Sequence, residues 1–189
     1  GEKFPAIIGA QNARVTLQNI RISETKAEGI FLRDACTIEG SNLKIERTGK
    51  TAIYVESTAQ IKLSGSCVSE SAEGCIVGNG STRITLTDCE LIGGGKNFPA
   101  LVALTKTHVT MHGGRIANTR SNGMWLRGES VTEANSVTIL DTTDAAIETE
   151  DSAQLKLVEC RLEGGQSYAL QAEGKSEIKA VACRINGHK

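Results

Sequence analysis

Five carboxylates between positions 141 and 151 form the densest acidic group of this chain. They are Asp141, Asp144, Glu148, Glu150 and Asp151. Two carboxylates held several ångströms apart in unlike environments can act as general acid and base, and a larger group can hold a hard cation such as Ca²⁺. Only Glu173, 23 residues after Glu150, adds an acid at a matching position in the next segment. We therefore expect a solvated acidic face rather than a catalytic or calcium site.

His108 and His112 are the other pair of side chains that could bind a metal ion. Alternating residues around them predict a strand, where residues four apart are separated by roughly 13 Å. That distance is too long for two ligands of one zinc ion, and no Cys-x2-Cys or mixed Cys/His spacing accompanies them. We predict no metal site and no cofactor, and no residue cluster identifies a reaction.

The elements that position these side chains are set by a repeat. A small residue followed by an apolar one recurs eight times at intervals of 22 to 26 residues. The pairs are Ala6-Ile7, Gly29-Ile30, Ala52-Ile53, Gly74-Cys75, Ala100-Leu101, Gly123-Met124, Ala146-Ile147 and Ala169-Leu170. A fixed period in this range predicts that each repeat is one structural unit stacked on its neighbours.

Each repeat carries three short runs of alternating apolar residues, separated by turn residues. Examples are the runs at 30–32 and 61–63 and the shorter run around Leu91. Alternation with β-branched residues predicts strands, and no segment shows helical periodicity over ten residues or more. The sequence therefore predicts an all-β, right-handed parallel β-helix of about eight coils, with three short strands per coil, as a single domain over residues 1–189. Glu133 falls near an inward position, so a bulge or register shift is expected within 131–135.

Two other solenoids are considered and disfavoured. A left-handed β-helix requires a hexapeptide period, which is absent. A leucine-rich repeat shares the 23-residue period, and Leu86-x-x-Cys89-x-Leu91 matches part of its signature. It also requires an asparagine soon afterwards and an apolar helical segment, whereas this chain has further strands.

With these repeats, the sequence resembles the right-handed β-helices of the pectate-lyase-like superfamily over essentially its whole length. The resemblance implies the fold but leaves the activity open, because that superfamily includes polysaccharide lyases, glycoside hydrolases, epimerases and non-catalytic interaction domains. The hydrolase motifs Gly-His-Gly and Arg-Ile-Lys are absent here, since Gly114-Arg115-Ile116 is not followed by lysine. The Asp-Pro-His motif of the epimerases and the acidic run of the lyases are absent as well.

One position of each repeat is expected to face outward, because side chains alternate along a strand. At this position the chain carries Ile8, Phe31, Tyr54, Ile76, Val102, Trp125, Glu148 and Gln171. Arg33 and Arg127 border this row, with acids beside them. An exposed apolar strip of this length predicts contact with another group. The occupant is a further segment of the protein, a partner protein or a polysaccharide. Our candidate binding residues are Phe31, Tyr54, Ile76, Val102, Trp125, Arg33 and Arg127.

The six cysteines do not have the spacing of a disulfide scaffold, which is short and lacks a repeat core. We expect most of them to be small buried thiols, although Cys160 and Cys183 would be stacked neighbours and could be bridged. Unpaired buried thiols favour a reducing, cytoplasmic compartment.

The charge balance gives no support for binding nucleic acid or an anionic membrane, since the net charge is -1 and the pI about 6.4. No apolar run is long enough to span a bilayer. We expect a non-catalytic scaffold, cut from a larger protein, that presents the outward strip to a protein or a polysaccharide. The alternative is a polysaccharide-processing enzyme with an incomplete active site. The open strand edges at the two coil ends also predict possible end-to-end self-association.

Overall fold

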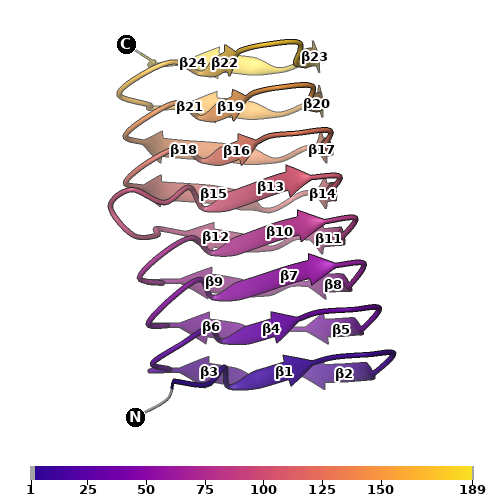
Figure 1. The fold of residues 1–189 in the computed structure, drawn as a ribbon. Coiled ribbons are helices and arrows are strands. Elements are labelled where there is room, and N and C mark those ends of the chain that lie inside the picture. The colour runs from indigo at the N-terminus through magenta and orange to yellow at the C-terminus, as the bar shows by residue number, and fades with distance from the viewer. Residues whose placement is uncertain (1–2, 189) are drawn as a thin grey trace.

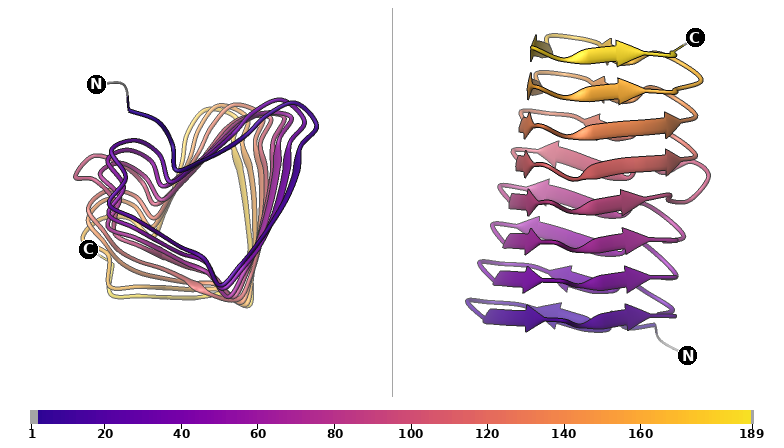
Figure 2. Two further views of the ribbon diagram at one scale, coloured as in Figure 1. Left: turned by 90° about the horizontal axis from the view of Figure 1, so that it is seen from below. Right: turned by 180° about the vertical axis from the view of Figure 1, so that it is seen from behind.

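The computed structural model describes residues 3–188, and within them the chain is a stack of eight coils (Figure 1). Each coil contributes one strand to each of three parallel, eight-stranded sheets, and the described residues contain no helix. Viewed along its axis, the stack has a roughly triangular outline whose corners twist gradually from coil to coil (Figure 2). This architecture confirms the predicted right-handed parallel β-helix.

Successive coils supply equivalent strands to the same sheet. The first sheet holds β1 (Ile7–Gly9), β4 (Ile30–Leu32), β7 (Ile53–Ser57), β10 (Ile76–Gly80), β13 (Leu101–Thr105), β16 (Met124–Leu126), β19 (Ile147–Thr149) and β22 (Leu170–Ala172). The second holds β2 (Arg14–Gln18), β5 (Thr37–Ser41), β8 (Gln60–Ser64), β11 (Arg83–Thr87), β14 (His108–His112), β17 (Val131–Asn135), β20 (Gln154–Val158) and β23 (Glu177–Val181). The third holds β3 (Arg21–Ser23), β6 (Lys44–Glu46), β9 (Cys67–Ser69), β12 (Glu90–Ile92), β15 (Arg115–Thr119), β18 (Thr138–Thr142), β21 (Arg161–Glu163) and β24 (Arg184–Asn186).

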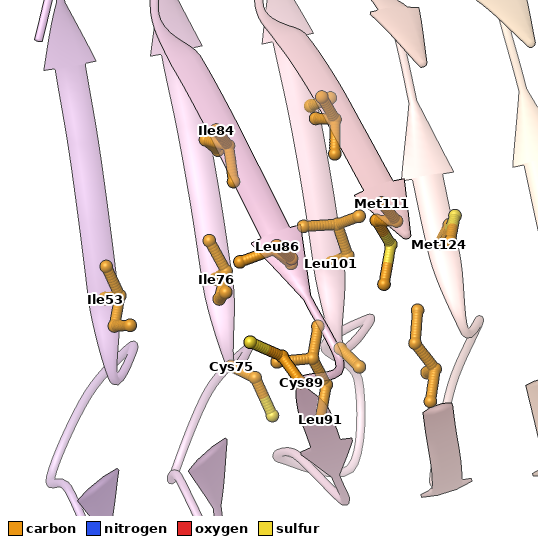
Figure 3. Packing of buried hydrophobic residues seen from close by; sticks show 14 of the residues in the cluster. Ile53, Cys75, Ile76, Ile84, Leu86, Cys89, Leu91, Leu101, Met111 and Met124 are labelled. Carbon is orange, nitrogen blue, oxygen red and sulfur yellow. The ribbon is translucent and has the colours of Figure 1, made fainter. Parts of the chain in front are cut away.

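The interior is filled by ladders of identical or similar apolar side chains. In the first sheet Ile30 stacks on Ile53, Ile53 on Ile76 and Ile76 on Leu101, and all four are fully buried. Figure 3 shows the part of this ladder from Ile53 to Leu101. Burying one such side chain contributes about 1.5–3 kcal/mol, so a continuous ladder stabilises every coil against its neighbours.

The small residue of each repeat lies at the corner that leads into the first sheet, where two coils approach closely. A Cβ added at Gly123 would lie only 2.6 Å from the carbonyl oxygen of Ala146 in the next coil. The corner between the second and third sheets imposes a different constraint. Each coil there places one residue in the left-handed region, and Asn19 and Asn42 at this position are joined by a side-chain hydrogen bond of 3.2 Å.

The expected distortion around Glu133 is absent, so that prediction was wrong. Strand β17 pairs residue for residue with β14 and β20, and Glu133 is exposed. The inward residues are Thr132 and Ala134, whereas Val131 is only half buried. Backbone hydrogen bonds to both neighbouring coils hold the register even though this strand points Thr132 inward and leaves Val131 on the outer face.

Coil six consequently carries polar groups in the interior. The hydroxyls of Ser130 and Thr132 are buried, and neither has a hydrogen-bond partner among the described protein atoms. One coil earlier the arrangement differs, because the hydroxyls of Thr82 and Thr107 lie 3.0 Å apart and satisfy each other. A buried hydroxyl without a protein partner is destabilising, so coil six is a weak point of the ladder.

Replacing the unpaired hydroxyl of Thr132 by a methyl group should therefore stabilise the domain. We expect Thr132→Val to raise the free energy of unfolding by about 1 kcal/mol, because the shape is kept and the unpaired polar atom is removed. Thr82→Val is the matched control and should lower it by about the same amount, since it breaks the bond to Thr107. Urea unfolding followed by circular dichroism measures both, and a destabilised Thr132→Val would show that the hydroxyl is satisfied in solution.

On the third sheet a nearly buried carboxylate is surrounded by three cations. The Glu46 side chain is 4% exposed and contacts Arg21, Lys44 at 2.9 Å and Arg47 at 3.1 Å. The hydrogen bonds from Lys44 and Arg21 lower the pKa of Glu46 from 4.5 to about 2. These residues come from adjacent coils, so the network ties the first and second coils together.

Because the pKa of Glu46 is depressed in the folded state, its stabilising contribution is complete above the unfolded pKa and is lost as the pH falls towards 2. We expect Glu46→Gln to lower the urea midpoint of unfolding at pH 7. The difference in midpoint between this variant and the parent protein should become smaller as the pH falls from 4.5 to 2. The exposed Glu129→Gln control should change the midpoint little at any pH. A gap that is constant across this range would show that the charge of Glu46 contributes nothing.

Candidate functional site

The outward side of the first sheet carries one continuous row of side chains, one from each coil. The strand register aligns Ile8, Phe31, Tyr54, Val77, Val102, Trp125, Glu148 and Gln171. We call these residues the outward row. Seven of the eight match the positions predicted from the repeat.

The exception is Ile76, whose predicted outward position was wrong. Ile76 is fully buried and stacks on Ile53 (Figure 3). Val77 is the residue that pairs with Tyr54. The reason is that the small residue of coil four is Cys75 and not Gly74. Its thiol lies inside the coil, 3.4 Å from the carbonyl oxygen of Gly93, and burial raises its pKa to about 12. A cysteine thus occupies the position that alanine or glycine fills elsewhere.

The first half of the outward row is apolar. Phe31 and Tyr54 stack with ring centroids 5.8 Å apart and planes inclined by 18°. Ile8 is 57% exposed, whereas Val102 is only 6% exposed although it lies on the outer face. Because the two rings cover each other, each keeps at most one free face. This half is an apolar surface without open aromatic faces on both sides of each ring. We call its residues, Ile8, Phe31, Tyr54, Val77 and Val102, the apolar ridge.

The second half of the row is polar and is organised around Trp125. The indole Nε1 donates to the Glu150 carboxylate at 2.9 Å, and the Arg127 guanidinium carbon lies 5.0 Å from the ring centroid. Arg127 also pairs with Glu150 at 2.9 Å. A tryptophan, a carboxylate and a guanidinium are therefore held together on adjacent coils, which fixes the orientation of the indole.

A groove of about 410 Å³ runs beside Trp125 across coils five to eight. Its lining is drawn from the loop before β13 and from the starts and outer faces of β16, β19 and β22. The residues are Asn97, Pro99, Ser121, Asn122, Trp125, Asp144, Ala145, Glu148, Glu150, Ser167 and Gln171. Most of these side chains can donate or accept hydrogen bonds, and three are acids.

Glu148 lies at the centre of this lining and differs electrostatically from the surface acids. Burial raises its pKa, and the neighbouring carboxylates of Glu150 and Glu173 raise it further, while a hydrogen bond from Asn122 acts in the opposite direction. Its charge is therefore destabilised by both desolvation and repulsion. Glu150, directly after the strand that carries Glu148, instead pairs with Arg127.

The candidate residues do not all meet at one place. Trp125 lines the groove and Arg127 braces its indole ring, but Phe31 and Tyr54 lie on the apolar ridge. Arg33 directly follows β4 in the second coil, away from the groove, and contacts Asp34 at 3.9 Å.

Sequence reasoning missed the groove and treated its acids as a solvated face. Asp144, Glu148 and Glu150 line it, whereas Asp151 accepts a hydrogen bond from the Gly128 amide. The groove could have been predicted from the shared outward position of Trp125, Glu148 and Gln171, which places an aromatic ring and two polar side chains on successive coils. Asn122, three residues before Trp125, adds a further polar side chain to this group.

Other candidate chemistry is not assembled in the described part of the chain. No three His, Cys, Asp or Glu side chains within residues 3–188 are placed to hold a metal ion. All six cysteines are free, including Cys160 and Cys183. Burial raises the pKa of Cys36, Cys89 and Cys160, which keeps these thiols protonated. None of the described residues forms a helix long and apolar enough to cross a membrane.

The comparison with family models matches the right-handed β-helix region, over residues 5–91 and again over 51–189. The chain belongs to this right-handed β-helix family. The two matches overlap over residues 51–91 and together cover nearly the whole chain. No curated protein and no solved structure matches the chain.

The corrected register of coil four makes a direct prediction about stability. Ile76→Ala should lower the free energy of unfolding by about 2–5 kcal/mol, because it opens a cavity in the core ladder. Val77→Ala should cost less than about 1 kcal/mol, since Val77 is half buried on the outer face. Denaturant unfolding of the two single variants measures the difference, and equal losses would contradict the assigned register.

Proposed function

We propose that this domain is a non-catalytic β-helix scaffold that binds a polysaccharide chain along the outer face of its first sheet. The supporting observation is the groove of about 410 Å³ that combines the indole of Trp125 with a lining of amide, hydroxyl and carboxylate groups. Ligand sites commonly pair an aromatic surface with a few convergent polar groups, and sugars offer matching C–H faces and hydroxyls.

The direction of the groove also suits a linear polymer. It crosses four coils, and coil spacings of about 4.8 Å give it a length of roughly 14 Å. Ser121, Asp144 and Ser167, which are spaced 23 residues apart, place hydrogen-bonding groups on three successive coils along this length. A chain lying parallel to the helix axis would therefore meet similar polar groups at regular intervals.

A partner protein is a second candidate, favoured by the apolar ridge. Ile8 is 57% exposed at the end of this ridge and Phe4, just before β1, is also exposed. Aliphatic side chains at this surface suit protein contact better than sugar stacking. In this alternative the ridge, and not the groove, carries the binding.

Glycan cleavage is the remaining alternative, and one observation favours it. Glu148 has a raised pKa and lies beside Glu150 in the groove, as a proton donor and a second carboxylate would. However, Glu150 is already bound by the Trp125 indole and by Arg127. Those contacts would have to be exchanged before Glu150 could attack or activate water.

The proposal is tested with the single tryptophan as reporter. Titration with a panel of neutral, acidic and amino-bearing oligosaccharides should give a saturable change in Trp125 fluorescence with one class. The Trp125→Ala variant has no tryptophan, so its binding is measured by calorimetry. It should bind the same class of oligosaccharide at least about tenfold more weakly, because a central aromatic contact is lost. Circular dichroism checks that the variant folds, as expected for an outward residue.

Tyr54→Ala is the matched aromatic control, because Tyr54 lies on the ridge and outside the groove lining. Unchanged glycan affinity in this variant, together with the loss in Trp125→Ala, places binding in the groove. If no oligosaccharide binds, the polysaccharide proposal fails and the ridge becomes the surface to test with proteins. Release of new reducing ends during the titration, abolished in Glu148→Gln, would replace binding by cleavage.

A further inference from the structure

We infer that the groove selects a polysaccharide whose sugars carry protonated amino groups, such as a glucosamine polymer, over neutral and uronate-containing chains. This inference rests on the proposed function and concerns the chemistry of its ligand. Three independent features of the groove carry it: the charges of the lining, the cation already held at Trp125, and the surroundings of Glu148.

The lining is acidic and contains no lysine or arginine. Its three charged residues are Asp144, Glu148 and Glu150. Among the described ion pairs, Glu150 is matched by Arg127, whereas Asp144 and Glu148 have no cationic partner. Glu173 lies beside the groove and adds a further negative charge that acts on Glu148. A uronate chain would bring carboxylates against these groups, so the electrostatic potential disfavours it.

The protein itself shows how a cation is held on this surface. Arg127 lies over the Trp125 ring at 5.0 Å from the centroid and forms an ion pair with Glu150 at 2.9 Å. The negative face of an indole and a carboxylate attract the same guanidinium. One coil further along, Glu148 is directly paired with Trp125 in the strand register. A ligand ammonium between this indole and Glu148 would repeat the same combination of groups.

The surroundings of Glu148 leave a place for a positive charge. Its neighbours are Glu150, directly after its own strand, the amide of Asn122 in the turn before β16, and the indole of Trp125 on β16. The last coil adds Gln171 and Glu173. Within the part of the chain that the structure describes, the groups that act on this carboxylate are therefore uncharged or negative. Burial and these neighbouring carboxylates raise the pKa of Glu148. A bound ammonium would supply the counter-charge that this carboxylate lacks and would offset its repulsion by Glu150 and Glu173.

The uncharged groups complete the fit for a sugar chain. Asn122, Gln171 and the hydroxyls of Ser121 and Ser167 can bind sugar hydroxyls on either side of the acids. An isolated amine would use only the acids, whereas a chain of amino sugars would use both sets. The groove therefore favours an amino-bearing oligosaccharide over a single cation.

Three oligosaccharides of equal length provide the test: glucosamine oligomers, their N-acetylated counterparts and oligogalacturonate, all titrated by calorimetry at pH 6. We expect the glucosamine oligomer to bind roughly tenfold or more tightly than the acetylated one, because charge-assisted hydrogen bonds are lost on acetylation. Its affinity should fall as salt is raised, and oligogalacturonate should bind weakest.

Glu148→Gln keeps the shape of the side chain and removes its charge. This variant should lose most of the preference for glucosamine oligomers while still binding the acetylated chain. Glu133→Gln, an exposed acid on β17 of the second sheet, is the matched control and should keep the preference. Urea unfolding verifies that both variants are folded.

The outcomes separate the two proposals. Equal affinity for the amino and acetylated chains, or a preference that survives Glu148→Gln, overturns the inference and leaves the polysaccharide proposal intact. Tighter binding of oligogalacturonate overturns the inference as well. The absence of binding by all three chains, with no change in Trp125 fluorescence, overturns the inference and counts against the proposed function.

Discussion

The parallel hydrogen bonding between successive coils is the constraint on which the rest of this structure depends. Each strand pairs with its equivalents in the coils before and after it, so residues at the same position of the repeat must stack. Inside the coil this gives ladders such as Ile30, Ile53 and Ile76, in which one side chain covers the next. Outside, the same rule places Trp125, Glu148 and Gln171 in one line. Core packing and the candidate site therefore have a common origin.

Stacking also has a cost when the stacked groups are polar. Like charges at one position are brought to the spacing of neighbouring strands, and water no longer separates them fully. The third sheet avoids this cost at Glu46 by surrounding it with Arg21, Lys44 and Arg47. In the groove Glu148 has no such cations around it, and burial first, then the nearby carboxylates of Glu150 and Glu173, raise its pKa. The same geometry thus yields a structural ion network on one face and an uncompensated acid on another.

The fold could be predicted from the sequence because the repeat specifies it many times over. Errors at single coils did not matter for the architecture. They did matter for individual residues. Choosing Gly74 rather than Cys75 as the small residue moved Ile76 to the wrong face, and placing Glu133 near an inward position made a regular strand look distorted. In both places the hydrogen bonds to neighbouring coils decided the register against the local pattern. The groove was not predictable in the same way, because the loop carrying Asn97 and Pro99 forms part of its wall and lies outside the repeat.

A rigid sheet face is well suited to holding such a site, because its side chains are positioned by strands that cannot shift independently. Trp125 is fixed by Glu150 and Arg127, and Glu148 by Asn122, so little ordering remains to be done when a ligand arrives. In the proposed function, this preformed surface with uncompensated acids would bind through charge and hydrogen bonding rather than through closure around the ligand. The apolar ridge has the opposite character, since Phe31 and Tyr54 satisfy each other by stacking. The asymmetry along one face argues that binding, where it occurs, is concentrated on the later coils.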